Sequence, residues 1–161
     1  MKNPDPLLKL STHTGVVRTL DDWSTMFHLV LVILPDRPEA AEWVPVGDRI
    51  FQVLGDADCR TAFVVPSTPA IAERILGTDE RINMTFVDPD KELVGSLGIT
   101  HLPAFVHLRQ DTTVAAGCEG WDPSAWQQVA NEIGKAMSWS VPELATLRQP
   151  ARTDGYPVET A

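Results

Sequence analysis

The sequence predicts one α/β domain in which a mixed β-sheet is flanked by helices, giving three layers. Residues 27–34 form an apolar run too short for a typical helix and apolar on both faces, as in a buried strand. Strand and helix patterns alternate from this run to residue 97, which is typical of sheets with parallel strands. A hairpin pattern and an amphipathic helix follow. A chain of 161 residues suits one such core.

The expected strands share short length, apolar or β-branched residues and a turn signal nearby. They are predicted at residues 16–18, 27–34, 60–65, 82–87, 104–108 and 112–116. The last two are separated by the polar turn Arg109-Gln110-Asp111 and are expected to form the hairpin. Residues 1–12 are polar and contain prolines, so we expect them to be loosely ordered.

The expected helices begin after residues that cap helices and end at glycine or at a loss of periodicity. They are predicted at residues 20–26, 48–54, 69–76, 92–97 and 123–137, with Thr19, Thr68 and Asp122 as caps. Pro45 is expected to interrupt any helix that begins near Glu39. The domain is therefore expected to span residues 1–138, and residues 139–161 to form a proline-containing, flexible C-terminal tail.

Composition limits the partners and the location of the protein. The net charge of −9 argues against nucleic acid and anionic membranes, which need a basic face, and favours a basic partner. No apolar stretch approaches the roughly 20 residues that cross a bilayer. The start of the chain, with Pro4, Asp5 and Pro6, is unlike a secretory signal. We therefore predict a cytoplasmic protein without a membrane span, which two widely spaced cysteines also fit.

Two segments carry a family resemblance. The tetrapeptide Asp36-Arg37-Pro38-Glu39 follows the first long strand, and Leu102-Pro103 precedes the hairpin, after Gly98-Ile99. With the order of elements, they resemble the thioredoxin-like superfamily, and the extra strand–helix pair before Asp88 resembles its peroxiredoxin-like members. The resemblance implies a thioredoxin-like three-layer sandwich in which Leu102-Pro103 is a cis-proline-type loop facing the tetrapeptide.

The cysteine pair of redox-active members is missing. The resemblance places Asp36 and Glu39 on the two cysteine positions, and carboxylates cannot attack a disulfide. Cys59 and Cys118 are expected just before and just after strands, as small buried hydrophobic residues. His101 beside Pro103 is expected to face the tetrapeptide, but the spacing matches no metal signature. We therefore predict no enzymatic activity, no cofactor and no metal.

The favoured hypothesis is a redox-inactive protein that binds a partner polypeptide, acting as a chaperone or assembly factor. A cis-proline loop offers backbone groups to an extended peptide, and the acidic surface would select a basic segment. The residues predicted to bind the partner lie in the two loops and beside them: Asp36, Arg37, Pro38, Glu39, Trp43, His101, Leu102 and Pro103.

Within that class, the chain resembles the HupG/HyaE-type chaperones of nickel–iron hydrogenase maturation. The resemblance rests on Leu20-Asp21-Asp22-Trp23, on Arg37-Pro38-Glu39, on the missing cysteine pair and on the helix bearing Trp126. It implies binding to a hydrogenase small subunit, including its twin-arginine leader. Two alternatives stay open: an atypical thiol oxidoreductase or peroxidase using Cys59 or Cys118, and an accessory subunit of a larger complex docking through its tail.

Overall fold

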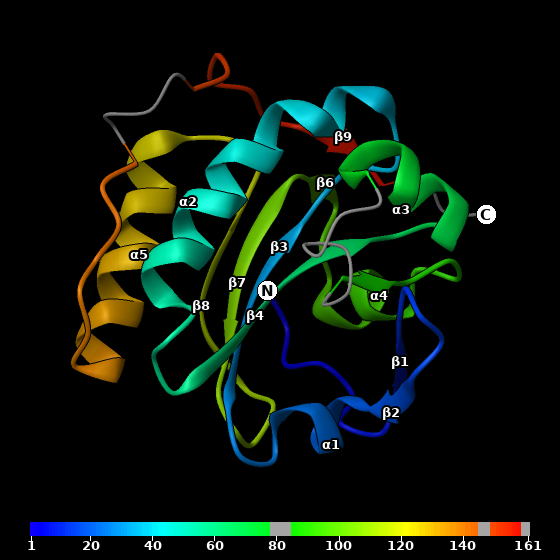
Figure 1. Ribbon diagram of the computed structural model, residues 1–161, viewed down its shortest axis with the longest axis horizontal. Coiled ribbons are helices and arrows are strands. Elements are labelled where there is room, and N and C mark those ends of the chain that lie inside the picture. The colour runs from blue at the N-terminus through cyan, green and yellow to red at the C-terminus, as the bar shows by residue number, and fades with distance from the viewer. Residues whose placement is uncertain (78–84, 145–148, 159–161) are drawn as a thin grey trace.

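The computed structural model describes residues 1–77, 85–144 and 149–158. A seven-stranded mixed sheet with the order β2-β1-β5-β4-β3-β7-β8 runs through the molecule (Figure 1). Its strands are β1 Lys9–Thr12, β2 Val17–Thr19, β3 His28–Ile33, β4 Cys59–Val65, β5 Phe86–Val87, β7 Ala104–Leu108 and β8 Val114–Glu119. A separate two-stranded sheet pairs β6 His101–Leu102 with β9 Tyr156–Pro157.

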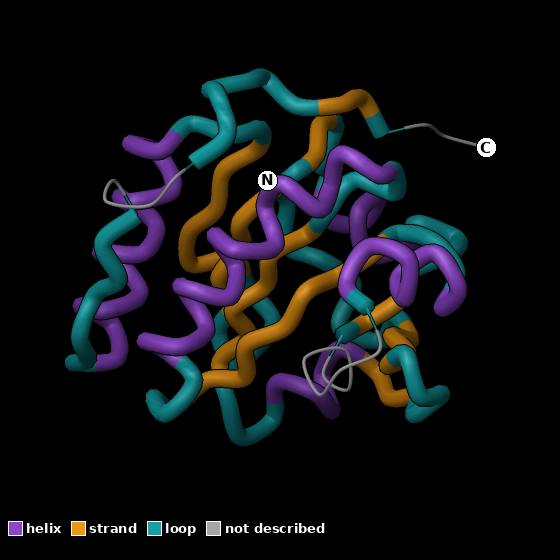
Figure 2. The backbone as a smooth tube through the Cα atoms, turned by 45° about the horizontal axis from the view of Figure 1, so that its top comes forward, coloured by secondary structure: helices purple, strands orange, loops and turns teal. Residues whose placement is uncertain are grey.

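Helices cover both faces of the large sheet, which gives the three predicted layers (Figure 2). The helices are α1 Leu20–Ser24, the 3-10 helix η1 Pro38–Trp43, α2 Val44–Leu54, α3 Pro69–Leu76, α4 Glu92–Leu97 and α5 Pro123–Met137. One apolar cluster joins one face of the sheet to η1, α2, α3 and α5, and a second joins the other face to α1 and α4. Among the described residues, no helix combines the length and the hydrophobicity needed to cross a membrane.

Strand β3 lies at the centre of this arrangement. It pairs in parallel with β4 and antiparallel with β7, so both of its edges are hydrogen-bonded. Val30 and Val32 point into the first cluster, whereas Leu29, Leu31 and Ile33 point into the second. Because side chains alternate along a strand, burial on both faces needs a continuous apolar run. The run at residues 27–34 is therefore correctly predicted as a buried strand.

The predicted capping residues occupy the expected positions. Thr19 and Thr68 accept hydrogen bonds from the backbone N–H groups of Asp22 and Ile71, at the starts of α1 and α3. Asp122 accepts one from Ser124 at the start of α5. These side chains satisfy N–H groups that have no partner within the helix. The starts of these helices are therefore confirmed.

Two predictions about local structure are wrong. The helix that begins near Glu39, η1, ends before Pro45 as expected, but the helix predicted at residues 48–54 begins earlier, at Val44, because Pro45 occupies the first turn of α2, where a missing N–H costs nothing. The segment 1–12 is not loosely ordered throughout, because β1 pairs with both β2 and β5 and buries Leu8 and Leu10. The spacing of these two leucines was the signal for this strand. Of the strand predicted at residues 82–87, the part before residue 85 lies outside the described residues.

The tail also departs from the prediction, because its described part packs on the domain. Residues 149–158 return to the sheet end where β7 begins, and β9 pairs there with β6. The backbone N–H and C=O of Trp121 form two hydrogen bonds with Thr153, at 2.8 and 3.0 Å. Leu144 is fully buried in the first cluster. Proline content therefore did not indicate a flexible segment here.

Two histidines meet at the other end of β3 and β7. His28 Nδ1 and His107 Nε2 lie 2.9 Å apart, so one ring nitrogen donates a hydrogen bond to the other. His107 is 1% exposed, and burial, with smaller contributions from the charges of His28 and Arg109, lowers its pKa to about 4. The folded protein therefore holds this pair neutral.

We predict that acid destabilises the protein through His107. Its folded pKa of about 4 lies below the ordinary value of 6.5, so the unfolded chain binds a proton first as the pH falls. Stability from this residue is complete above pH 6.5 and decreases as the pH approaches 4, by about 3 kcal/mol. Urea denaturation at pH 7 and pH 4 measures this loss. The loss should shrink in His107→Gln and persist in His101→Gln; equal losses in all three proteins contradict the prediction.

Candidate functional site

The candidate site lies where β3 and β4 end and β7 begins. The loop after β3 faces the Leu102-Pro103 peptide bond, which is cis, as the resemblance implied. Between them is a pocket of about 340 Å³. Its lining residues come from the predicted tetrapeptide, the cis-proline loop and the C-terminal segment: Pro35, Asp36, Arg37, Pro38, Glu39, Pro66, Lys91, Leu102, Tyr156, Pro157 and Val158.

Both carboxylates of the tetrapeptide are paired with cations. Glu39 accepts a hydrogen bond from Arg37 at 3.0 Å, and Asp36 lies 3.8 Å from the ammonium group of Lys91. A hydrogen bond from its own backbone N–H, together with the one from Arg37, lowers the pKa of Glu39. Carboxylates paired with cations in this way leave little net charge to select a basic peptide.

An aromatic side chain from the tail covers the tetrapeptide. The guanidinium of Arg37 stacks 4.0 Å above the centroid of the Tyr156 ring. The same ring also packs against the Trp43 indole in a T-shaped arrangement, with 6.2 Å between the ring centroids. Trp43 itself is only 1% exposed. The prediction that Trp43 touches a partner therefore does not fit its position, because this indole lies in the core beneath Tyr156. No local sequence pattern indicates this role of Tyr156, because the residue lies far along the chain from Arg37.

His101 does not face the tetrapeptide as expected. Its Nδ1 contacts the hydroxyl of Thr100 at 3.0 Å, and its backbone N–H donates to the carboxylate of Glu119 at 3.0 Å. Glu119 also accepts a hydrogen bond from the backbone N–H of Thr100, so it fixes the start of β6. Within the described parts of the chain, no group of three or more metal-ligating side chains is arranged around a common point.

The two cysteines lie at opposite ends of the sheet, and both are free thiols. Cys59 opens β4 opposite His28, away from the pocket, and its Sγ donates to the carbonyl of Leu54 at 3.2 Å. Burial, with a smaller contribution from the Asp58 charge, raises the pKa of Cys59 to about 11. This thiol is a buried structural residue, as the sequence suggested.

Cys118 lies at the same end of the sheet as the pocket. It falls inside β8 opposite Phe105, and the next pair in register, Glu119 and Ala104, directly follows cis-Pro103. The side chain is half-buried. Burial raises its pKa to about 12, although the backbone N–H of Phe105 acts in the opposite direction. The thiol is therefore protonated at neutral pH, and it is the cysteine nearer in register to the cis-proline.

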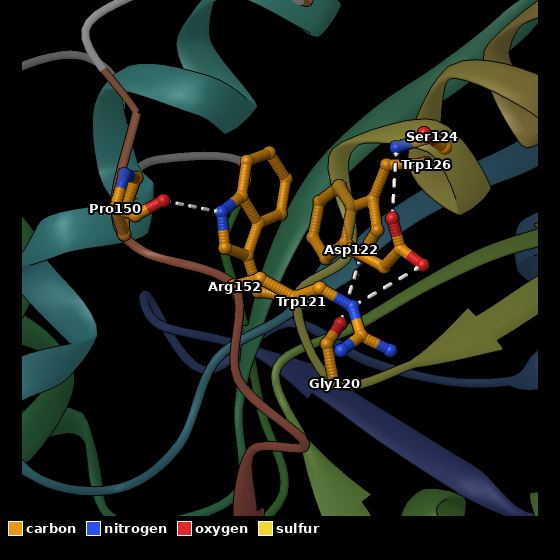
Figure 3. A network of polar contacts seen from close by, with 7 residues as sticks. All are labelled: Gly120, Trp121, Asp122, Ser124, Trp126, Pro150 and Arg152. Carbon is orange, nitrogen blue, oxygen red and sulfur yellow. Dashed lines mark hydrogen bonds and ion pairs between the residues drawn. The ribbon is translucent and has the colours of Figure 1, made fainter.

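A polar network next to Cys118 fixes the returning tail (Figure 3). The indole N–H of Trp121 donates to the carbonyl of Pro150, and that of Trp126 donates to the carbonyl of Gly120, both at 2.8 Å. Arg152 lies 3.6 Å from the carboxylate of Asp122. Both tryptophans are fully buried and pack edge to face at 4.9 Å. Their only polar groups thus hold the tail and the turn before α5 (Figure 3).

Asp88 is a buried carboxylate at the same end of the sheet, but it is committed to structure. It follows β5 and accepts hydrogen bonds from three consecutive backbone N–H groups at the start of α4, those of Glu92, Leu93 and Val94. Burial raises its pKa against the effect of these hydrogen bonds. Its oxygens therefore hold α4 in place and are not free for chemistry on a substrate.

Removing the Asp88 carboxylate should destabilise the protein. Asp88→Ala leaves three N–H groups without their acceptor, two of them buried, and should cost on the order of 3 kcal/mol. Asp90→Ala is the matched control, because Asp90 is exposed on the same turn. Urea unfolding curves measure both. A loss in Asp88→Ala no larger than that in Asp90→Ala would show that the carboxylate is not what holds α4.

No protein-family model and no curated protein sequence matches the chain, whereas many solved structures share its fold. A Chlorobium tepidum protein assigned as the thiol:disulfide interchange protein DsbE superposes with a TM-score of 0.69 at 16% identity, covering 84% of this chain and 96% of that one. The exposed lipoprotein thioredoxin Etrx1 of Streptococcus pneumoniae gives 0.59 at 20% identity, covering 78% and 98%. Xanthomonas campestris peroxiredoxin Q gives 0.61 at 12% identity, covering 81% and 89%.

The fold is thus thioredoxin-like, as the sequence predicted. These neighbours contradict the favoured hypothesis of a redox-inactive, non-enzymatic chaperone, because they are named for thiol–disulfide or peroxide chemistry. They agree better with the alternative, an atypical thiol oxidoreductase or peroxidase, and they give no support to hydrogenase maturation. At such low identities the likeness establishes the fold alone, and the chemistry has to be argued from this chain's own residues.

Proposed function

We propose that the protein is an atypical thiol–disulfide oxidoreductase that uses Cys118 and binds its polypeptide substrate along β6. The observation that carries this proposal is the position of Cys118. It lies one register step from the residue pair that follows cis-Pro103, whereas Cys59 lies at the opposite end of the sheet. The names of the structural neighbours supply the class of reaction.

The substrate proposed for this site is an extended segment of a partner polypeptide. Beside cis-Pro103, the short strand β6 has a backbone edge that accepts an antiparallel strand, as its pairing with β9 demonstrates. Extended segments bind such edges through main-chain hydrogen bonds, with side-chain pockets adding selectivity. Asp36, Pro38 and Glu39 belong to the proposed binding surface. Because Arg37 and Lys91 neutralise the carboxylates, we propose an extended segment with no requirement for basic residues.

The proposed reaction is disulfide exchange on the bound polypeptide. Cys118 loses its proton, and the thiolate attacks one sulfur of a substrate disulfide. The substrate S–S bond breaks as the Cys118–substrate S–S bond forms, and the departing sulfur keeps the electron pair and takes up a proton. A second substrate thiol then attacks the mixed disulfide and restores Cys118. The substrate's disulfide has moved, and no external oxidant is consumed.

The burial of Cys118 sets the rate of this reaction. With a pKa of about 12, only about one thiol in 10⁵ is ionised at pH 7. Exchange by the folded protein is therefore slow at neutral pH, and a substrate that exposes the thiol accelerates it. The predicted cytoplasmic location stays a prediction, since one neighbour is a secreted oxidoreductase and another an exposed lipoprotein.

We predict that Cys118 reacts with disulfides in proportion to its ionisation. With the aromatic disulfide 5,5′-dithiobis(2-nitrobenzoate) in excess, the rate of mixed-disulfide formation should rise about tenfold per pH unit between pH 7 and pH 10, because the pKa lies above this range. Absorbance follows the released thiolate, and mass spectrometry assigns the modified cysteine. Cys118→Ser should abolish this phase and Cys59→Ser should leave it unchanged.

A disulfide-bearing peptide tests the substrate class. The mixed disulfide should form on Cys118 of the Cys59→Ser protein and decay when a free thiol is added. Cys118→Ala serves as a second variant if the serine disturbs β8. Modification confined to Cys59, or equal rates with and without Cys118, would reject the proposal. A rate with hydrogen peroxide that exceeds the rate with the peptide would reject disulfide exchange in favour of peroxidase chemistry.

A further inference from the structure

The edge proposed to bind a partner is already occupied by the chain's own C-terminal segment. Strand β9 pairs with β6 so that Tyr156 lies opposite Leu102 and Pro157 opposite His101. The backbone N–H of Val158 extends the pairing by donating to the carbonyl of Thr100 at 2.8 Å. Figure 1 shows β9 beside β6 at one end of the large sheet. An extended segment thus lies directly along the residue that precedes the cis-proline.

The side chain of Tyr156 forms the wall of the pocket on the tail side. Its ring packs against the Arg37 guanidinium at 4.0 Å and against the edge of the Trp43 indole. An aromatic ring attracts a guanidinium through its negative face, and burying the ring adds a hydrophobic gain. Tyr156, Pro157 and Val158 all line the pocket. The surface on which this segment lies therefore accepts an aromatic residue followed by two compact apolar ones.

A tight turn brings the segment into register. Thr153 is hydrogen-bonded to Trp121 through both backbone groups, and the chain then turns at Gly155 with φ of +90°. A Cβ atom on Gly155 would lie 2.5 Å from the carbonyl oxygen of Leu102, which is closer than real contacts allow. Only glycine permits this backbone to approach β6 so closely. The docking of β9 against β6 therefore requires glycine at position 155.

The docked segment is held weakly compared with the core strands. The sheet of β6 and β9 has only two residue pairs, whereas β3 forms six pairs with β4 and five with β7. Tyr156 is only half-buried, and Pro157 is exposed. Local opening needs little free energy where few apolar contacts and hydrogen bonds are lost. Release of this segment is thus easier than separation of β3 from β4 or β7.

We infer that residues 153–158 are an internal ligand of the β6 edge, which a partner polypeptide must displace. The inference rests on the proposed function only in placing the partner at this edge; it does not need the thiol. The segment also indicates what the partner presents: an extended backbone with an aromatic side chain opposite Leu102, stacked on Arg37. The partner's affinity is reduced by the fraction of protein that is closed.

Two glycine variants test this inference in the full chain. Gly155→Ala introduces the clash with Leu102 and should release the segment. Gly15→Ala is the matched control, because Gly15 has φ of +93°, close to the +90° of Gly155, but has open space around its Cβ position. Both variants carry Cys118→Ser, so the measurement does not depend on the proposed chemistry. The probe is the fluorescein-labelled peptide Arg-Thr-Asp-Gly-Tyr-Pro-Val, the sequence of residues 152–158.

Fluorescence anisotropy should show peptide binding to Gly155→Ala that is about tenfold or more tighter than to the wild type or to Gly15→Ala. Replacing the peptide tyrosine by alanine should remove the binding. Tyr156→Ala is a second opening variant, which keeps the test valid if Gly155→Ala does not fold. Equal peptide affinities in the two glycine variants would overturn the inference. Equal affinities for the peptides with tyrosine and with alanine would also overturn it.

Two further readouts separate this inference from its competitors. Hydrogen exchange at the N–H of Val158 should accelerate in Gly155→Ala and not in Gly15→Ala. Light scattering should show that Gly155→Ala is monomeric. A dimer in which two copies exchange β9 would mean that the ligand of β6 comes from a second chain, and this result would also overturn the inference. Peptide binding without any Cys118 reactivity would leave this inference standing and remove only the proposed reaction.

Discussion

Burial of β3 on both faces and both edges is the constraint on which the other features depend. Leu29 to Ile33 are fully buried. Their side chains point alternately to the two faces of the sheet, so that one set packs with α1 and α4 and the other with the remaining helices. A shift of one residue would exchange the two faces, so the register with β4 and β7 has a single stable solution. That register brings the loop after β3 opposite cis-Pro103 and places Cys118 one residue pair away from Ala104, which follows this proline. The packing of β3 in the core therefore determines the positions of the residues in the candidate site.

Local patterns predicted most of the fold because they are complete within a few residues. The apolar run at residues 27–34, the caps Thr19 and Asp122 and the hairpin all depend on near neighbours, and all were confirmed. The errors arose where a residue's role depends on context. The helix predicted from residue 48 begins at Val44, because Pro45 lies in its first turn, where proline is tolerated, although proline disrupts the interior of a helix.

The candidate site was only partly predictable, because its contacts join segments far apart in the chain. The tetrapeptide and the cis-proline loop were found through a resemblance, but nothing near Tyr156 indicates that its ring covers Arg37. The pairing of Asp36 with Lys91 was equally hidden, because the two residues lie far apart in the chain, whereas Arg37 is two residues from Glu39 and its pairing was within reach of the sequence. The missing cysteine pair was read correctly, but the inference from it to an inert chaperone was not.

The pairing of β9 with β6 also bears on how the protein behaves in concentrated solution. A strand edge with unpaired N–H and C=O groups acts as a template for other chains, and natural proteins protect such edges by covering them. Released from β9, the β6 edge would present that template. The C-terminal segment therefore also affects association between copies of the protein: while it stays docked, it covers the edge of β6 with which a strand of a second copy could pair.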